Sequence, residues 1–279
     1  MRRRVWCETL PFGDVVAAGP ALAARRVDLL LAVRPWQVAD ARDAVARLRA
    51  GGVYVALWPM IADGDGRWAS VASCEPFVRF ADELVGAVPC DEVAIDLEPP
   101  KPQLEKLRAG HFAWTARRHF GDARDRLARA IAGWRARGVA RVTTAVMPML
   151  AAELAGDWMQ RLLGTPTALP VDRHSVMAYT SLYEGWSRTR TRAWVDRGRA
   201  ELLLAATARL ARLRFGDRAG LSLGCVGTGA FGDEPCYRDP GELARDAAIA
   251  RRAGIAELSL FDLGGVVRRG PVDAWLDAL

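Results

Sequence analysis

The sequence predicts one α/β domain, a single (β/α)8 (TIM) barrel that spans residues 1–279, on three observations. First, 279 residues are close to the ~250 residues that one such barrel typically contains. Second, eight short β-branched or apolar runs alternate with segments of helical spacing, which implies a parallel sheet with right-handed crossovers. Third, no GxGxxG motif follows the first run, which disfavours an open dinucleotide-binding sheet. Eight units therefore favour closure into a barrel.

The expected strands follow the apolar runs in chain order. We place them at Arg4–Thr9, Val27–Val33, Val53–Trp58, Glu92–Glu98, Arg141–Met147, Ser175–Thr180, Leu221–Val226 and Glu257–Asp262. Apolar residues three and four positions apart, as in residues 41–48, indicate the helices between them. The helix after Asp239 has the clearest boundaries, because Pro240 suits its first turn and Glu242 completes a capping box. Gly254 is expected to end that helix.

Three connections are long or rich in turn residues. They follow the third strand (Pro59–Ser73), the fourth strand (Pro99–Phe120) and the seventh strand (Gly227–Pro240). Loops at the carboxyl ends of the strands form the active face of a barrel. These segments therefore predict the end of the barrel at which a functional site is assembled.

The composition narrows the classes of partner. The formal charge is +6, but the arginines are spread over helices and mixed with acidic residues, as in residues 117–137. A nucleic-acid-binding surface clusters its basic residues, so we expect no nucleic-acid partner. No apolar run reaches the ~18 residues of a membrane span, so we expect no membrane partner. The composition leaves the oligomeric state open.

The cysteines, the histidines and the start of the chain bear on cofactors and location. The five cysteines lack CxxC spacing and the three histidines lack paired-ligand spacing, so we expect neither a metal nor another cofactor. The basic start Met1–Arg4 imitates a signal peptide, but Glu8, Pro11 and Asp14 interrupt the apolar stretch that would follow. We therefore expect a cytoplasmic protein, although an exported chain trimmed of its leader would look the same.

The expected fourth strand carries the sharpest chemical signal. Alternate residues of a strand face the same way, so Ala94, Asp96 and Glu98 share one side and the apolar residues between them share the other. The apolar side suits packing against helices, which points Asp96 and Glu98 into the upper end of the barrel. Two carboxylates roughly 7 Å apart in a confined site provide a protonated acid beside an ionised partner. No strand offers an obvious inward arginine to neutralise them, so we interpret the pair as catalytic.

This strand resembles the Asp-x-x-Asp-x-Asp-x-Glu signature of the family-18 glycoside hydrolases, the chitinases and endo-β-N-acetylglucosaminidases. It matches at Asp91, Asp96 and Glu98, with Ala94 in place of the middle aspartate. The resemblance implies a retaining glycoside hydrolase that acts on an N-acetylhexosamine-containing glycan by substrate-assisted catalysis. It makes Glu98 the acid that protonates the glycosidic oxygen. Asp96 would orient the substrate's own 2-acetamido group, which acts as the nucleophile.

The expected sixth strand extends the resemblance. Residues 175–180 are similar to the family's Met-x-Tyr-Asp strand, with Thr180 in place of the aspartate. The resemblance makes Tyr179 a hydrogen-bond donor to the acetamido group and places Met177 among the residues that bind substrate. Because the middle aspartate of the signature is absent, we expect the hydroxyl group of Tyr179 or Thr180 to hold Asp96.

Aromatic residues complete the expected carbohydrate site. The closing strand resembles that of the family, with Phe261 where the family usually has tryptophan. Four tryptophans fall at strand ends or in the segments after the third, fourth and sixth strands: Trp58, Trp68, Trp114 and Trp186. Flat aromatic faces suit the apolar faces of sugar rings. Together with Met177, the residues that we expect to bind the substrate are Trp58, Trp186, Phe261 and Asp262.

A second interpretation is a barrel enzyme that acts on a phosphorylated or otherwise anionic small molecule. Barrels often bind phosphate in the loops after the seventh and eighth strands, where this chain has glycines at 227–232 and 264–265. Arg268 and Arg269 follow the second of these loops. The arginines after the sixth strand would suit the same ligand, although they would not all face one way in a helix: Arg188, Arg190 and Arg192.

A third interpretation is a carbohydrate-binding barrel that lost turnover with the middle aspartate. An open aromatic groove without a proton donor within reach of the sugar would favour this interpretation. An electropositive pocket without an aromatic floor would favour the anionic ligand instead.

Overall fold

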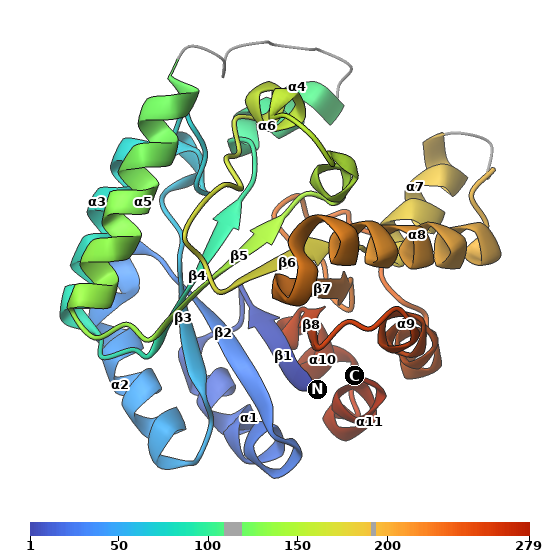
Figure 1. The fold of residues 1–279 in the computed structure, drawn as a ribbon. Helices are drawn as coiled ribbons and strands as arrows, with labels where there is room; N and C mark the ends of the chain where they lie inside the picture. Colours follow the sequence, from blue (N-terminus) through green and yellow to red (C-terminus); the bar gives the residue numbers. More distant parts are fainter. Residues whose placement is uncertain (109–118, 191–193) are drawn as a thin grey trace.

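A computed structural model describes residues 1–108, 119–190 and 194–279, and in these ranges eight parallel strands close into a barrel in chain order (Figure 1). The strands are β1 (Arg2–Cys7), β2 (Val27–Val33), β3 (Val55–Pro59), β4 (Glu92–Leu97), β5 (Arg141–Val146), β6 (Arg173–Met177), β7 (Ala219–Gly224) and β8 (Glu257–Phe261). Pairing of β1 with β8 completes the ring. The predicted fold class and the eight predicted strands are confirmed.

The strand boundaries differ from the predicted ones by a few residues. β1 begins at Arg2 instead of Arg4, because Arg2 pairs with Glu257 at the start of β8. β6 ends at Met177 instead of Thr180, because Thr180 is the first residue of the next helix. The predicted β1, β4, β5, β6, β7 and β8 extend one to three residues past the observed ends, and β2 has the predicted bounds.

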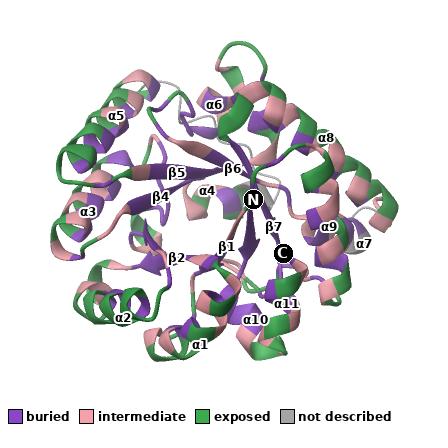
Figure 2. Cartoon of the chain, turned by 60° about the horizontal axis from the view of Figure 1, so that its bottom comes forward, coloured by how far each residue is buried: buried purple, intermediate pink, exposed green. Residues whose placement is uncertain are grey.

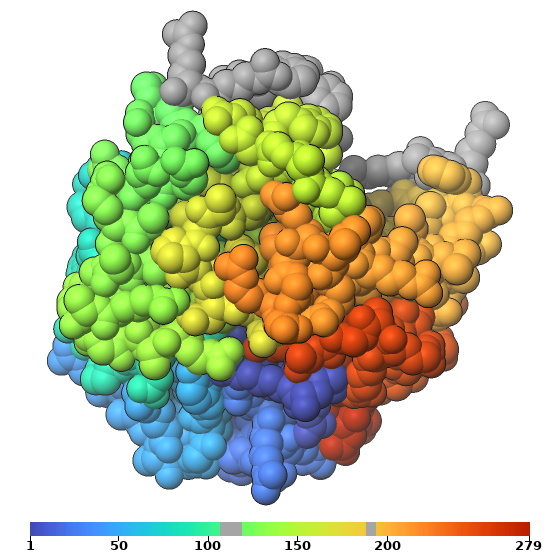
Figure 3. Space-filling model, in the orientation of Figure 1, coloured from blue at the N-terminus to red at the C-terminus, as the bar shows by residue number. Residues whose placement is uncertain are grey.

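Helices cover the outside of the barrel, with buried inner faces and exposed outer faces (Figure 2). They are α1 (Phe12–Arg25), α2 (Val38–Ala50), α3 (Cys74–Ala87), α4 (Lys101–Arg108), α5 (Phe120–Ala136), α6 (Trp158–Leu163), α7 (Thr180–Arg190), α8 (Arg197–Phe215), α9 (Pro240–Arg252), α10 (Leu263–Arg269) and α11 (Val272–Ala278). In Figure 3, α5 in green and α8 in orange lie on the face of the molecule that is turned toward the viewer. None of the helices in the described ranges is long and apolar enough to cross a membrane.

The α9 helix tests the predicted capping pattern. Asp239 accepts a hydrogen bond from the backbone N–H of Glu242 at 3.0 Å, and Pro240 occupies the first position, as predicted. The predicted capping box is wrong in one respect. The Glu242 carboxylate accepts from the backbone N–H of Arg238 at 2.7 Å and pairs with the guanidinium group of Arg238, so it does not reach back to Asp239.

The apolar core has two parts. The larger part fills the space between the strands and the helices. The smaller part lies inside the barrel and includes Trp6, Leu30, Ala56, Trp58, Ala94, Ala145, Cys225 and Phe261. Trp6 and Trp58 meet there edge to face, with ring centroids 4.8 Å apart. This inner apolar layer separates the polar groups at the two ends of the barrel.

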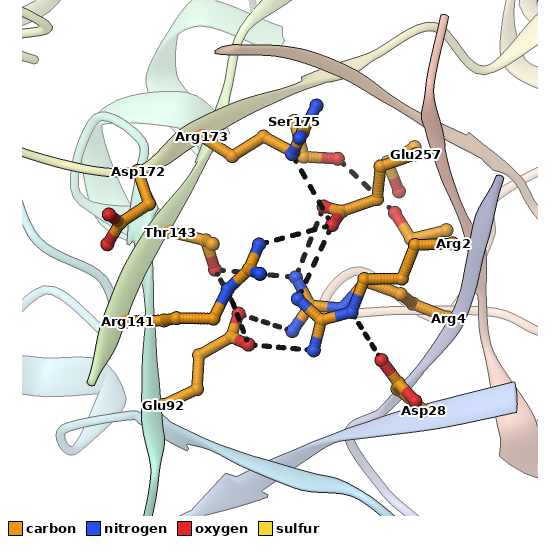
Figure 4. Close-up of polar contacts among 12 residues, drawn as sticks. Arg2, Arg4, Asp28, Glu92, Arg141, Thr143, Asp172, Arg173, Ser175 and Glu257 are labelled. Carbon is orange, nitrogen blue, oxygen red and sulfur yellow. Dashed lines mark hydrogen bonds and ion pairs between the residues drawn. The ribbon is translucent and has the colours of Figure 1, made fainter. Parts of the chain in front are cut away.

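A buried ion network closes the end of the barrel at which the strands begin (Figure 4). Arg4 lies inside it and contacts Glu92 at 2.5 Å and Glu257 at 3.3 Å. Arg2 contacts the same two glutamates at 2.9 and 3.5 Å. Thr143 donates a further hydrogen bond to Glu92 at 2.9 Å. Burial favours the neutral form of Glu92, but Arg4 and Arg2 outweigh it and hold the pKa of Glu92 below its ordinary value.

The expectation that no strand carries an inward arginine is therefore wrong. Arg4 is on β1 with its side chain 2% exposed. It does not neutralise Asp96 or Glu98, because its carboxylate partners, Glu92 and Glu257, stand at the opposite end of the barrel. The burial of Arg4 was not predicted from the sequence, because an arginine near the start of a strand is most often exposed.

We predict that Arg4→Met lowers the free energy of unfolding by about 3 to 5 kcal/mol at pH 7, because two buried glutamates lose a partner. Chemical denaturation measures this loss. The matched control is Arg49→Met, which breaks the exposed ion pair with Asp91 and is expected to change stability by less than about 1 kcal/mol. Equal stability of the Arg4 variant and the wild type would contradict a structural role for the network.

Candidate active site

A cavity of about 320 Å³ opens at the carboxyl ends of the strands. Residues from β1, β3, β4, β5, β6 and β8 reach it, as do the loops that follow β3, β5 and β7 and the helices α4 and α7. Its lining includes Trp6, Glu8, Trp58, Trp68, Asp96, Glu98, Leu104, Met147, Met177, Tyr179, Trp186, Cys225, Phe231, Glu234 and Phe261. The structure thus brings the predicted residues Asp96, Glu98, Tyr179, Trp58, Met177, Trp186 and Phe261 to one cavity.

The carboxyl groups of Asp96 and Glu98 form a hydrogen-bonded pair at the top of β4. Asp96 is 5% exposed, and its Oδ1 atom has no hydrogen-bond partner among the described residues. Glu98 is partly exposed toward the cavity. The period of two along β4 explains this placement, since Val93 and Ile95 belong to the core between strands and helices while Ala94 belongs to the core inside the barrel.

Burial raises the pKa of both carboxyl groups. For Glu98, burial acts together with the negative charge of Glu8 and raises the pKa to about 8, although Arg67 opposes the shift. For Asp96, burial and the negative charge of Glu98 raise the pKa well above its ordinary value. Two acids this close titrate as a unit, so the pair retains a proton at neutral pH. A protonated acid beside a carboxylate is the arrangement that general acid catalysis requires.

Tyr179 stands in the cavity with a defined orientation. Its hydroxyl group lies 3.2 Å from Ser222 Oγ, and its ring stacks on Phe261 with centroids 6.0 Å apart. The indole N–H of Trp6 donates to Ser222 at 3.1 Å and to Ser259 at 3.0 Å. Burial raises the pKa of Tyr179 well above its ordinary value, so the hydroxyl group stays protonated and able to donate.

The expectation that a hydroxyl group of Tyr179 or Thr180 holds Asp96 is wrong. The Tyr179 hydroxyl group bonds to Ser222, as described above. Thr180 donates to the buried carboxylate of Asp246 and accepts from Arg197 at 3.0 Å. As the first residue of α7, Thr180 faces α8 and α9 instead of the cavity. It therefore joins helices together.

Aromatic side chains line much of the cavity. Trp58 is buried at the end of β3, Trp68 comes from the loop after β3, and Trp186 comes from α7. Trp114 lies outside the described residues. Sequence reasoning missed Trp6 of β1 and Glu8, the residue that follows β1, which both line the cavity. Arg4, Trp6 and Glu8 are two positions apart and therefore face the same side. The same rule of alternate residues that selected Asp96 and Glu98 would have found Trp6 and Glu8.

Of the residues predicted to bind substrate, Asp262 is not among those that line the cavity. It is fully buried at the start of α10, where its Oδ1 atom accepts the backbone N–H of Gly265 at 2.9 Å. Burial raises the pKa of Asp262 to about 6, and the Gly265 N–H opposes that shift. The last residue of the predicted strand is therefore a helix cap.

The loops after β7 and β8 leave no room for a phosphate group between them. A Cβ atom on Gly265 would lie 2.2 Å from the backbone nitrogen of Gly227, so the loop after β7 is in direct contact with the first turn of α10, which follows β8. The Asp262 carboxylate already occupies the N-terminus of α10. Arg269 donates to the backbone carbonyl oxygens of Val226 and Tyr237 at 3.3 and 2.6 Å, which ties it to the scaffold.

The charges of the cavity also disfavour an anionic ligand. Among the described residues that line it, the charged types are all acidic: Glu8, Asp96, Glu98 and Glu234. Of the predicted arginine cluster, Arg192 lies outside the described residues, and the side chains of Arg188 and Arg190 lie outside them as well. The described residues contain no group of three His, Cys, Asp or Glu side chains that could hold a metal ion.

The comparisons with known proteins concern the fold. No family model matches the sequence, and no curated protein matches it. The glycoside hydrolase domain of PgaB (BpsB) from Bordetella bronchiseptica has a TM-score of 0.62 at 13% identity, over 100% of this chain and 98% of that one. The family GH18 chitinase from Cycas revoluta, solved in complex with allosamidin, has a TM-score of 0.57 at 13% identity. The match covers 100% of this chain and 99% of that one.

A third similar structure is the class V chitinase from Nicotiana tobaccum, with a TM-score of 0.55 at 12% identity, over 99% of this chain and 98% of that one. At such low identity the likeness shows a shared barrel fold. It covers nearly the whole of each chain in all three cases.

We predict that Glu98→Gln flattens the dependence of stability on pH. The folded pKa of about 8 exceeds the ordinary value of 4.5, so between these values the folded protein binds more protons than the unfolded chain. The contribution of Glu98 to the free energy of unfolding of the wild type therefore falls as the pH rises from 5 to 9. Glutamine removes that contribution, so the variant gains stability relative to the wild type across the same window.

Urea denaturation at pH 5, 7 and 9 measures the effect. Glu105→Gln, on the exposed side of α4, is the matched control and should follow the wild type. Parallel pH profiles for Glu98→Gln and the wild type would show that Glu98 titrates normally.

Proposed function

We propose that the protein is a retaining glycoside hydrolase that acts on an N-acetylhexosamine-containing glycan by substrate-assisted catalysis. The observation that carries the proposal is the hydrogen-bonded, proton-retaining pair of Asp96 and Glu98 in an aromatic cavity. The signature on β4 supports it. So does the likeness in fold to proteins that are described as chitinases and as a glycoside hydrolase domain.

In the first step, Glu98 donates its proton to the glycosidic oxygen, and the bond between the anomeric carbon and that oxygen breaks. The carbonyl oxygen of the sugar's own acetamido group forms the new bond to the anomeric carbon, on the opposite face of the ring. The leaving sugar departs as a neutral alcohol. Asp96 stabilises the positive charge of the resulting oxazolinium ring. Asp96 must be ionised to do so, and its proton affinity therefore matters at this stage.

In the second step, Glu98 acts as a base. It takes a proton from a water molecule, and the water oxygen attacks the anomeric carbon as the bond to the acetamido oxygen breaks. Two displacements leave the anomeric configuration unchanged, and the acetamido group and Glu98 return to their starting forms. A raised pKa suits Glu98 to both tasks, because the same group must give up and regain a proton near neutral pH.

Two features of the site suit an acetamido group. The Oδ1 atom of Asp96 is buried without a partner among the described residues, so it can accept the acetamido N–H when the side chain turns toward the cavity. The Tyr179 hydroxyl group has Ser222 as its partner and can donate its proton to the acetamido oxygen. Because Trp6 also donates to Ser222, that hydroxyl group remains satisfied when Tyr179 turns to substrate.

The missing middle aspartate is consistent with the inner apolar layer. Ala94 is fully buried and lies in the same inner cluster as Trp6 and Trp58. A carboxylate at this position would be surrounded by apolar side chains, which is costly without a partner. In place of a shared proton deeper in the barrel, Asp96 has the hydrogen bond to Glu98.

We predict that Glu98→Gln lowers the rate of glycan hydrolysis by about 2 to 4 orders of magnitude while the fold and affinity are retained, the usual effect of losing a general acid. Release of chromophore from an N-acetyl-β-glucosaminide and its β-1,4 oligomers measures the rate, and calorimetry measures binding. Glu105→Gln on α4 is the control for the loss of one exposed glutamate. Binding without turnover in the wild type would instead indicate a carbohydrate-binding barrel, and unchanged turnover in Glu98→Gln would refute the assignment.

A further inference from the structure

A buried ion pair of Glu8 and Arg67 stands beside the Asp96–Glu98 pair. Arg67 Nη2 contacts Glu8 Oε1, and the side chains of Arg67 and Glu8 are only 7% and 3% exposed. Arg67 Nη1 also contacts Asp63 at 2.6 Å, so the guanidinium group is held from two sides. Its Cζ atom lies over the ring of Trp68, 5.5 Å from the ring centroid. A charge so restrained and so little solvated acts strongly on its neighbours.

The backbone around Arg67 explains why the ion pair lies next to β4. Strands β3 and β4 pair directly only at Leu57 and Val93 in the described sheet. Nearer their carboxyl ends, Ala69 pairs with Leu97, and its N–H donates to the backbone oxygen of Asp96 at 2.9 Å. The segment after β3 therefore takes the place of a strand neighbour beside the catalytic acids.

The groups that face the two acids come from several elements. Glu8 comes from the end of β1, Arg67 from the segment after β3, Glu234 from the loop after β7, and Tyr179 from the residues after β6. Glu234 is committed to that loop, where it accepts the N–H groups of Gly229 and Phe231 at 3.0 and 2.9 Å. Arg67 is a cation that acts on both Asp96 and Glu98.

We propose that Glu8 and Arg67 are positioning residues for the Asp96–Glu98 pair, with Arg67 supplying a fixed positive charge that Glu8 holds in place and partly offsets. The proposal rests on the proposed function in that it assigns the purpose of the ion pair to hydrolysis. Neither side chain needs to touch the scissile bond. Together they define the electrostatic surroundings in which the catalytic proton is kept.

The two members of the pair act in opposite directions on Glu98. Glu8 raises its pKa and Arg67 lowers it. Hydrolysis requires Glu98 to be protonated, so the alkaline limb of the activity profile follows its pKa. Glu8→Gln removes a negative charge and should move that limb to lower pH, whereas Arg67→Gln removes a positive charge and should move it to higher pH. A neighbouring buried charge shifts such a limb by about one pH unit.

The experiment compares pH profiles of kcat/KM for the wild type, Glu8→Gln, Arg67→Gln and the double variant. We expect opposite shifts in the single variants and a limb close to that of the wild type in the double variant. Arg67→Lys keeps the charge and should retain the wild-type limb. Arg49→Gln removes an exposed ion pair with Asp91 at the other end of β4 and is expected to shift nothing. A purely structural pair would lower activity without moving the limb, and that result would overturn the proposal.

A second readout separates this proposal from the proposed function. The pH dependence of unfolding reports the proton affinity of the acid pair whether or not glycans are hydrolysed. If the wild type hydrolyses nothing but the opposite shifts appear in the unfolding profiles, the electrostatic role stands and the glycosidase assignment fails. If hydrolysis occurs and folded single variants show no shift, or shifts of the same sign, the role of Glu8 and Arg67 is refuted.

Discussion

The structure depends on keeping two carboxyl groups side by side at one end of a closed barrel, with Asp96 buried and Glu98 only partly exposed to the cavity. Removing a carboxylate from water is costly, and a second negative charge beside it adds to the cost. Asp96 and Glu98 meet this constraint by retaining a proton between them. The proton-retaining state is also the chemically useful one. The surrounding elements act on this pair in three ways: they bury it, orient it or place charges beside it.

The interior of the barrel has three layers, and β1 and β4 contribute side chains to each of them. At the base, Arg4 of β1 contacts Glu92 of β4, and these charges are paired. In the middle, Trp6 and Ala94 belong to one apolar cluster. At the top, Glu8 from the end of β1 and the acids of β4 share the cavity wall. The same two strands thus place a stabilising ion network at one end and an incompletely paired acid cluster at the other, with apolar side chains between them. This arrangement separates stability from chemistry, as is usual in barrels.

Much of the fold was predictable from the sequence because strands and helices alternate with clear periods. The period of two also selected Asp96 and Glu98 correctly as neighbours facing the cavity. What escaped prediction depends on contacts between residues distant in the chain. Arg67 and Glu8 are 59 residues apart, and nothing local in either segment indicates their ion pair. The capping role of Asp262 escaped prediction for a different reason, since an acidic residue at a strand end can serve a substrate or cap the following helix, and here its carboxylate accepts the N–H of Gly265 in α10.

The central claim is that Asp96 and Glu98 share a proton because they are buried together, and the most direct test is to observe their titration. Carbon-13 NMR of protein labelled at the aspartate and glutamate carboxyl groups follows each signal with pH, and Asp96→Asn and Glu98→Gln assign the two resonances. The account predicts that both signals respond together and that the Glu98 step falls at about pH 8. Independent titration of both groups near pH 4, the range of solvated carboxyl groups, would contradict it.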